Sequence, residues 1–248
     1  MTRDLVTDVN GSMRSTFGRL AGHASGGECR RFGRVTVASA GLPLSLANQV
    51  FVFEAPPRDD LDAAVEWLRT REVPFQVTAA ESGTGTVEAL AEALDLVVVG
   101  EMPGMAVDPL DGVLPGESAA VVSEVTDTRG LEAFVGAFAA AFGVVGDLAR
   151  AWHPTSVLTD DGLRPFVGRV DGEAVACGML SWNGHVAGVY TVGVVPGSRR
   201  RGIGEAVTRA VLRAGNEAGC TVGVLQASEM GYRIDRKSTR LNSSHRLR

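Results

Sequence analysis

The chain has 248 residues, 45% of them hydrophobic and 21% charged, a composition typical of a globular protein with one large domain or two lobes. Its formal net charge of −5 argues against a nucleic-acid-binding protein, whose domain would normally be basic. Cys29, Cys177 and Cys220 lie far apart without metal-ligand spacing. We therefore expect no disulfide framework, no metal site and a reducing cytoplasmic location.

No segment has the pattern of a targeting signal or a membrane span. The N-terminus lacks a charged segment followed by an apolar core, so no signal peptide is predicted. The longest apolar stretch, residues 133–145, is too short to cross a bilayer and carries phenylalanines at helical spacing. It is therefore predicted to be a core helix, and no membrane partner is expected.

Residues 1–101 are predicted to form a small α/β lobe. The first 33 residues are polar and rich in glycine, with a possible short helix over residues 12–20. Runs of β-branched, aromatic or apolar residues predict strands at residues 35–39, 49–53, 74–78 and 96–99. Apolar residues at helical spacing predict helices at residues 61–68 and 87–94. Residues 102–117, with three prolines and three glycines, predict a linker between the lobes.

Residues 118–234 predict a second α+β domain. A strand at residues 119–125 leads to a helix that Asp127 or Thr128 can cap. The pairs Asp171–Gly172 and Asn183–Gly184 favour type I′ turns, because both central residues of that turn need positive φ. They predict an antiparallel meander of three strands, followed by a long helix and a last strand, at residues 166–170, 173–182, 185–194, 202–214 and 221–226.

The last fourteen residues, 235–248, differ in composition from the rest. Of the 24 lysines and arginines in the chain, only Lys237 is a lysine, and it lies in this segment. The segment also has no periodic apolar pattern. The stretch 235–245, DRKSTRLNSSH, is similar to the conceptual translation of a common sequencing-adapter oligonucleotide. The alternative is a genuine basic tail. Under either reading, we expect a disordered segment that takes no part in the fold.

The segment between the last meander strand and the long helix has the features of an anion site. Pro196 ends the strand, and the chain turns into a helix near Gly202. A helix start exposes unpaired N–H groups and the positive end of the peptide dipole. Glycines allow an anion to approach the backbone, and three arginines add charge, at positions Gly202, Gly204, Arg199, Arg200 and Arg201.

Two phosphate-binding motifs do not fit this segment. A P-loop would need a Gly-Lys-Ser/Thr sequence, which is absent. A dinucleotide-binding fold would need a βαβ unit, whereas the preceding strand belongs to an antiparallel meander. The remaining alternative is a glycine-rich helix start with three solvated arginines.

The pattern Arg199-x-x-Gly202-x-Gly204, preceded by Val194-x-Pro196, resembles the acyl-CoA signature of the GCN5-related N-acetyltransferases, the GNAT family. The predicted order of strand, helix, meander, signature helix and strand is also similar. The resemblance covers residues 118–234 and implies a mixed α/β fold, an acyl-CoA N-acyltransferase-like sheet with flanking helices. Residues 1–101 resemble, more remotely, the degenerate half of two-lobed members.

The resemblance implies which residues bind acetyl-CoA. Backbone groups of the strand would pair with the pantetheine amides, and the helix start would hold the pyrophosphate. The implied residues are Val192, Gly193, Val194, Arg199, Arg200, Arg201, Gly202, Ile203, Gly204 and Glu205. A primary amine would attack the thioester directly, with an N–H near Val194 stabilising the oxyanion.

The end of the chain departs from the family pattern. Members often place a proton-donating tyrosine after the last predicted strand, but Tyr232 lies three residues too early. The final two strands are also missing, so a C-terminally truncated domain is expected. Glu124 and Glu229 are candidate bases. His153 and His185 are expected to be exposed, and Cys177 and Cys220 to belong to the core. The catalytic residues therefore stay unassigned, as do the amine substrate and the oligomeric state. An acyl-CoA-binding module without chemistry, or a purely structural lobe, is the alternative.

Overall fold

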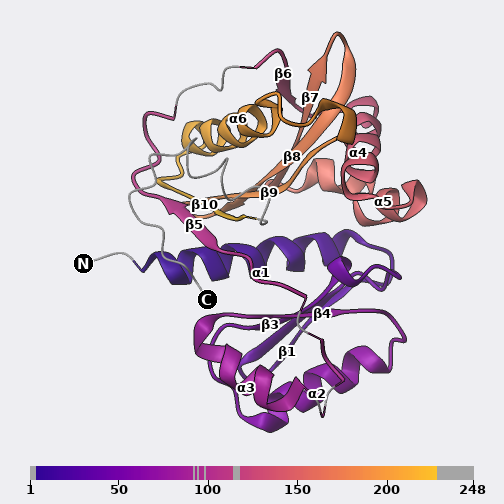
Figure 1. Cartoon of the computed structure of the whole chain (residues 1–248), viewed down its shortest axis with the longest axis vertical. Coiled ribbons are helices and arrows are strands. Elements are labelled where there is room, and N and C mark those ends of the chain that lie inside the picture. Colours follow the sequence, from indigo (N-terminus) through magenta and orange to yellow (C-terminus); the bar gives the residue numbers. More distant parts are fainter. Residues whose placement is uncertain (1–3, 92, 94, 98, 114–117, 228–248) are drawn as a thin grey trace.

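The protein is described by a computed structural model covering residues 4–91, 93, 95–97, 99–113 and 118–227. It contains a four-stranded and a six-stranded sheet (Figure 1). Helix α1 (Leu5–His23) lies between the two sheets and packs against both. The other helices cover the outer faces of the sheets and the rest of the inner face of the larger one.

The four-stranded sheet has the order β1-β2-β3-β4, in which only β3 and β4 are parallel. Its strands are β1 (Glu28–Phe32), β2 (Val35–Ser39), β3 (Asn48–Val52) and β4 (Gln76–Ala79). Helices α2 (Arg58–Arg69) and α3 (Glu81–Ala91) cover the face opposite α1. The apolar stripe of α2 that was predicted from its spacing packs on valines of β2 and β3.

The six-stranded sheet has the order β5-β10-β9-β8-β7-β6, in which only β9 and β10 are parallel. Its strands are β5 (Gly104–Val107), β6 (Val121–Glu124), β7 (Leu163–Val170), β8 (Glu173–Asn183), β9 (Val186–Val194) and β10 (Val222–Gln226). Helix α6 (Ile203–Glu217) covers one face. Helices α1, α4 (Thr128–Phe142) and α5 (Gly146–Trp152) cover the other.

Two tight turns join the strands of the predicted meander. Asp171 and Gly172 both have positive φ, 51° and 86°, as the type I′ prediction requires. The second turn differs from the prediction, because Asn183 still pairs with Val186 at the strand ends. Its loop is therefore Gly184–His185, and φ is positive only at Gly184, which fits a type II′ turn with glycine first.

Helix α1 is longer than the predicted helix over residues 12–20. Asp4 caps it, since its Oδ1 accepts hydrogen bonds from the backbone N–H of Val6 and Thr7 at 3.1 and 3.3 Å. Val9 packs with the six-stranded sheet, and Met13 packs with Phe51 of the four-stranded sheet. Burial on two sides offsets the low helix propensity of the glycines in this segment.

Three further predictions of local structure were wrong. In the predicted strand at residues 96–99, the described residues 96, 97 and 99 are not in a strand: Val97 and Val99 are 82% and 85% exposed, so an apolar run alone did not produce a buried strand. Within the predicted linker, residues 104–107 form β5, which pairs with β10. Residues 28–32, assigned to a polar segment, form the edge strand β1. The domain boundaries themselves stay a prediction.

The two-sided burial of α1 predicts a large stability effect at Leu20. This side chain is 1% exposed and belongs to an apolar cluster that also contains Ala47 and Trp152. Leu20→Ala should lower the free energy of unfolding by about 2–5 kcal/mol, measured by urea titration.

Gly22→Ala is the matched control on the same helix. Gly22 is exposed, and an added Cβ would meet nothing within 4 Å, so this variant should gain about 0.5–1 kcal/mol. Equal urea midpoints for the two variants would contradict the position of α1 between the sheets.

Candidate functional site

A β-bulge interrupts the pairing of β8 with β9. Cys177 pairs with Gly193 and Met179 pairs with Tyr190, so Thr191 and Val192 together lie opposite Gly178. Thr191 has a φ of 50°, a region that β-branched residues rarely adopt. Strained backbone of this kind gathers at binding and catalytic sites, so the bulge marks β9 as a candidate site.

Beyond the bulge, one edge of β9 is open. The parallel pairing with β10 runs from Val186–Val222 to Val189–Leu225 and ends there. Among the described residues, no strand pairs with residues 190–194 on that side. Backbone groups on an open strand edge are available to an extended ligand that carries amides of its own.

Close packing from both faces of the sheet holds the bulge. A Cβ at Gly178 would lie 2.4 Å from Val207 Cγ1 of α6. A Cβ at Gly193 would lie 2.7 Å from Phe142 Cε2 and 2.8 Å from Ala141 Cβ, both on α4. At the point where the open edge begins, α4 and α6 approach β8 and β9 so closely that both positions admit only glycine.

The start of α6 forms the second half of the site. Gly202 precedes the helix with a φ of 72° and provides no side-chain cap, so the first N–H groups of the helix lack an intrahelical acceptor. Arg200 has a φ of 59°, and both Arg200 and Arg201 are exposed beside these N–H groups. The carboxylate of Glu205 is held by Arg209 at 2.9 Å. The arrangement suits an anion with several oxygens.

Arg199 connects the two halves. Its Nε donates to the carbonyl of Val194 and its Nη2 to the carbonyl of Ala141, each at 3.0 Å. The guanidinium therefore joins the last residue of β9 to the end of α4. This geometry gives Arg199 a positioning role that its place in the motif did not reveal.

The ten residues predicted from the motif thus lie on one continuous path. Val192, Gly193 and Val194 form the open part of β9, and the other seven residues form the turn and the first turn of α6. Thr191 was not predicted. Nothing local in the sequence marks it, because its conformation results from the register shift opposite Gly178.

The other polar candidates that the structure describes do not gather at this path. Glu124 is exposed at the end of the edge strand β6, and His185 pairs with Asp8 of α1 at 3.2 Å. Glu229 and Tyr232 lie outside the described residues, as does the predicted tail 235–248. Cys177 and Cys220 are buried, as predicted, and burial raises the pKa of the Cys177 thiol to about 12.

His153 is a clear correction. It was expected to be exposed, but it is 1% exposed and is enclosed by the rings of Phe134, Phe138 and Trp152. Its Nδ1 lies 3.1 Å from the carbonyl of Ala149, while its Nε2 has no hydrogen-bond partner in the described part of the chain. Burial lowers the pKa of His153 to about 4, so the ring is neutral near pH 7.

Residues 133–229 match the family model described as acetyltransferase (GNAT) family. Among solved structures, a GCN5-related N-acetyltransferase from Kribbella flavida is similar, with 17% identity, a TM-score of 0.64, and coverage of 91% of this chain and 89% of the other. A GCN5-related N-acetyltransferase from Sphaerobacter thermophilus has 18% identity, a TM-score of 0.52, and coverage of 83% and 72%. A search of curated proteins found no match.

A third similar structure is a functionally unknown conserved protein from Staphylococcus epidermidis, with 12% identity, a TM-score of 0.57, and coverage of 86% and 88%. At these identities the likeness shows the fold. It confirms the predicted α+β class with an acyl-CoA N-acyltransferase-like mixed sheet and flanking helices. In the described ranges, no helix combines the length and apolarity that a bilayer crossing needs.

The buried neutral imidazole predicts a specific acid sensitivity. The pKa of His153 is about 4 in the folded chain against an ordinary value of 6.5, so the unfolded state binds the proton more tightly. Stability is then highest above pH 6.5 and falls by about 3 kcal/mol as the pH drops towards 4. His153→Phe should remove this part of the pH dependence in urea titrations.

His185→Phe is the control, because that ring is about half exposed. It should leave the slope between pH 6.5 and 4 largely unchanged. If His153→Phe kept the full slope as well, the acid sensitivity would have to come from other groups.

Proposed function

We propose that this chain, whose residues 133–229 match the GNAT acetyltransferase family model, is an N-acetyltransferase that transfers an acetyl group from acetyl-CoA to a primary amine. The observation that carries the proposal is the continuity between two surfaces. The open edge of β9 runs directly into the uncapped start of α6. The strand edge can pair with an extended chain that carries amides, and the helix start can bind a polyanion. Acetyl-CoA carries both groups in that order.

The residues fit the donor as follows. The pantetheine arm adds alongside Val192, Gly193 and Val194 as a short extra strand. Its pyrophosphate accepts hydrogen bonds from the first N–H groups of α6, and the Arg200 and Arg201 guanidiniums balance its charge. Arg199 holds the end of β9 against α4 and so keeps the two binding surfaces aligned.

The transfer step is a direct attack by the amine. The neutral amine nitrogen bonds to the thioester carbonyl carbon, and a backbone N–H on the open part of β9 stabilises the oxyanion. The C–S bond then breaks, the amine loses a proton and the CoA thiolate gains one.

A cytoplasmic location also belongs to the proposal, and it is supported by three cysteines that are free of disulfides.

Thermal denaturation with acetyl-CoA tests the donor site. Acetyl-CoA at a hundred times its Kd should stabilise the folded chain by about 2.7 kcal/mol and raise the Tm by several degrees. Gly202→Glu should abolish the shift, because it places a carboxylate at the anion site and a side chain at a φ of 72°.

Gly136→Glu is the matched control for that variant. It adds the same charge on α4, where Gly136 is exposed and an added Cβ would meet nothing within 4 Å. It should keep the full Tm shift. An equal shift in the Gly202→Glu variant would remove the support for the site.

Release of the CoA thiol in the presence of a panel of primary amines separates an enzyme from a binding module. An acetyltransferase should release thiol at a rate that depends on the amine, and the Gly202→Glu variant should not. A Tm shift without amine-dependent thiol release would favour the second candidate, an acyl-CoA-binding module. For this test, acetylated product identified by mass gives a readout independent of the thiol.

A further inference from the structure

A cleft lies at the other end of β9 from the start of α6. It has a volume of about 670 Å³ and opens between α1, β1 and the end of β8 at Asn183. Because β9 separates the β8–β9 turn from Gly202, the two sites are distinct. The cleft is large enough for a small-molecule ligand.

Small residues form part of the α1 side of the cleft. Gly11, Ser15 and Gly18 follow one another on one face of the helix. An added Cβ would meet nothing within 4 Å at Gly11, and at Gly18 it would make only an ordinary 3.5 Å contact with Cys29 Sγ. Packing therefore requires neither glycine, although each costs the helix about 0.5–1 kcal/mol relative to alanine. What the glycines provide is open space in the cleft.

Two guanidiniums in the cleft have no carboxylate partner among the described residues. Arg14 projects from α1, and Arg31 from β1 donates its Nε to the carbonyl of Gly33. Arg19 also lines the cleft, but Asp160 balances its charge at 2.7 Å. The described residues that line the cleft include no aspartate or glutamate. Two positive charges without an ion-pair partner among the described residues thus line one cleft, in a chain whose net charge is −5.

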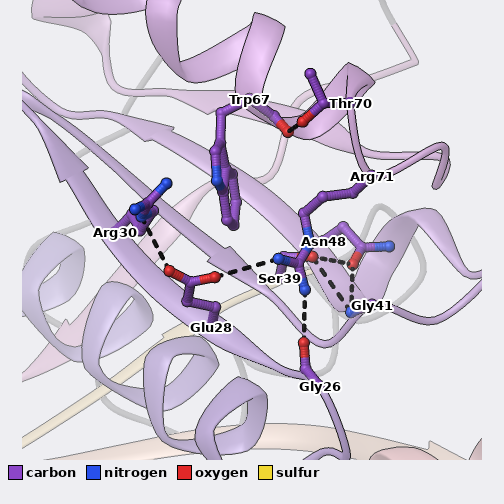
Figure 2. A network of polar contacts seen from close by, with 9 residues as sticks. All are labelled: Gly26, Glu28, Arg30, Ser39, Gly41, Asn48, Trp67, Thr70 and Arg71. Carbon is purple, nitrogen blue, oxygen red and sulfur yellow. Dashed lines mark hydrogen bonds and ion pairs between the residues drawn. The ribbon is translucent and has the colours of Figure 1, made fainter.

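Arg30 also lines the cleft, but Glu28 balances its charge at 2.9 Å. Figure 2 shows its side chain near Trp67 on α2, where Glu28 binds both Arg30 and Arg71. The Arg30 guanidinium lies 5.5 Å from the centre of the Trp67 ring. Trp67 lies on the side of the sheet opposite α1, so Arg31 and Cys29, which alternate with Arg30 along β1, face the cleft.

The thiol of Cys29 completes the cleft wall. Cys29 is exposed, whereas Cys177 and Cys220 are buried. Partial burial raises the pKa of Cys29, and the charge of Arg14 opposes that effect. The thiol is therefore neutral near pH 7 and does not compensate the two arginines.

We propose that this arginine cleft, formed by Arg14, Arg31, Cys29, Gly11 and Gly18, binds a small polyanion that carries phosphate or carboxylate groups. Guanidiniums from two facing elements can each hold an oxyanion group in a bidentate manner. The site is independent of the proposed acetyl-CoA site, since it uses other elements and lies at the opposite end of β9.

Alkylation of Cys29 in the full chain reports on the cleft directly. Iodoacetate and iodoacetamide differ by one negative charge, so their rate ratio, referenced to free cysteine, measures the attraction of an anion to the thiol. The ratio should be raised about threefold to tenfold in the wild-type chain. In Arg14→Gln/Arg31→Gln it should fall to the free-cysteine value, and any change in thiol pKa cancels in the ratio.

Arg58→Gln/Arg213→Gln removes the same charge from exposed positions on α2 and α6 and should keep the wild-type ratio. Inorganic pyrophosphate and citrate should each slow alkylation of Cys29 in a saturable way. The one effective at the lower concentration identifies phosphate or carboxylate as the preferred group. In the Gly202→Glu variant, pyrophosphate and citrate should protect Cys29 as well as they do in the wild-type chain. This result would separate the test from that of the acetyl-CoA site.

Three results would overturn the proposal. The first is an unchanged rate ratio in Arg14→Gln/Arg31→Gln, with folding verified by urea titration. The second is protection by pyrophosphate and citrate that is no greater than protection by sodium chloride of equal ionic strength. The third is protection that persists undiminished when both arginines are replaced.

Discussion

The candidate acetyl-CoA site depends on one extra residue in β9. Thr191 and Val192 lie opposite the single Gly178, and the strand changes direction there. Upstream of the bulge, β9 pairs with β10; downstream, no strand in the described part of the chain pairs with that edge. Without the bulge, a regular parallel pair could continue along β9 and occupy the backbone groups that the proposed donor requires. The positive φ of Thr191 costs on the order of 1–3 kcal/mol, and the surrounding packing has to hold it.

Helix α1 makes the two sheets parts of one packed body. It shares apolar clusters with Val186 and Val222 of the larger sheet and with Phe51 of the smaller one. Tyr190, the residue before the bulge, donates its hydroxyl to Ser12 of α1 at 3.1 Å, and burial raises its pKa to about 12. The N-terminal part of the chain therefore supports the strand that carries the proposed site. β5 extends the same dependence, because it covers the outer edge of β10.

Features set by local chemistry could be predicted from the sequence. The Asp171–Gly172 turn, the apolar stripe of α2 and the helix start at Gly202 each follow from neighbouring residues. Features set by distant partners could not. The length of α1 depends on two sheets that bury it, and the buried position of His153 depends on rings from α4. The exposed side chains of Val97 and Val99 show the converse, since apolar character without a partner surface did not produce a strand.

The role of Arg199 illustrates why a motif predicts a site better than it predicts the work of each member. By spacing alone, Arg199, Arg200 and Arg201 are three equivalent charges beside a helix start. All three are exposed in the fold, but Arg199 also donates hydrogen bonds to the carbonyls of Val194 and Ala141. Gly193 packs against Ala141 at the end of α4, and Gly178 packs against Val207 of α6. The open edge is thus fixed from both faces and at its end, so a donor chain would meet a preformed strand and lose little free energy in ordering it.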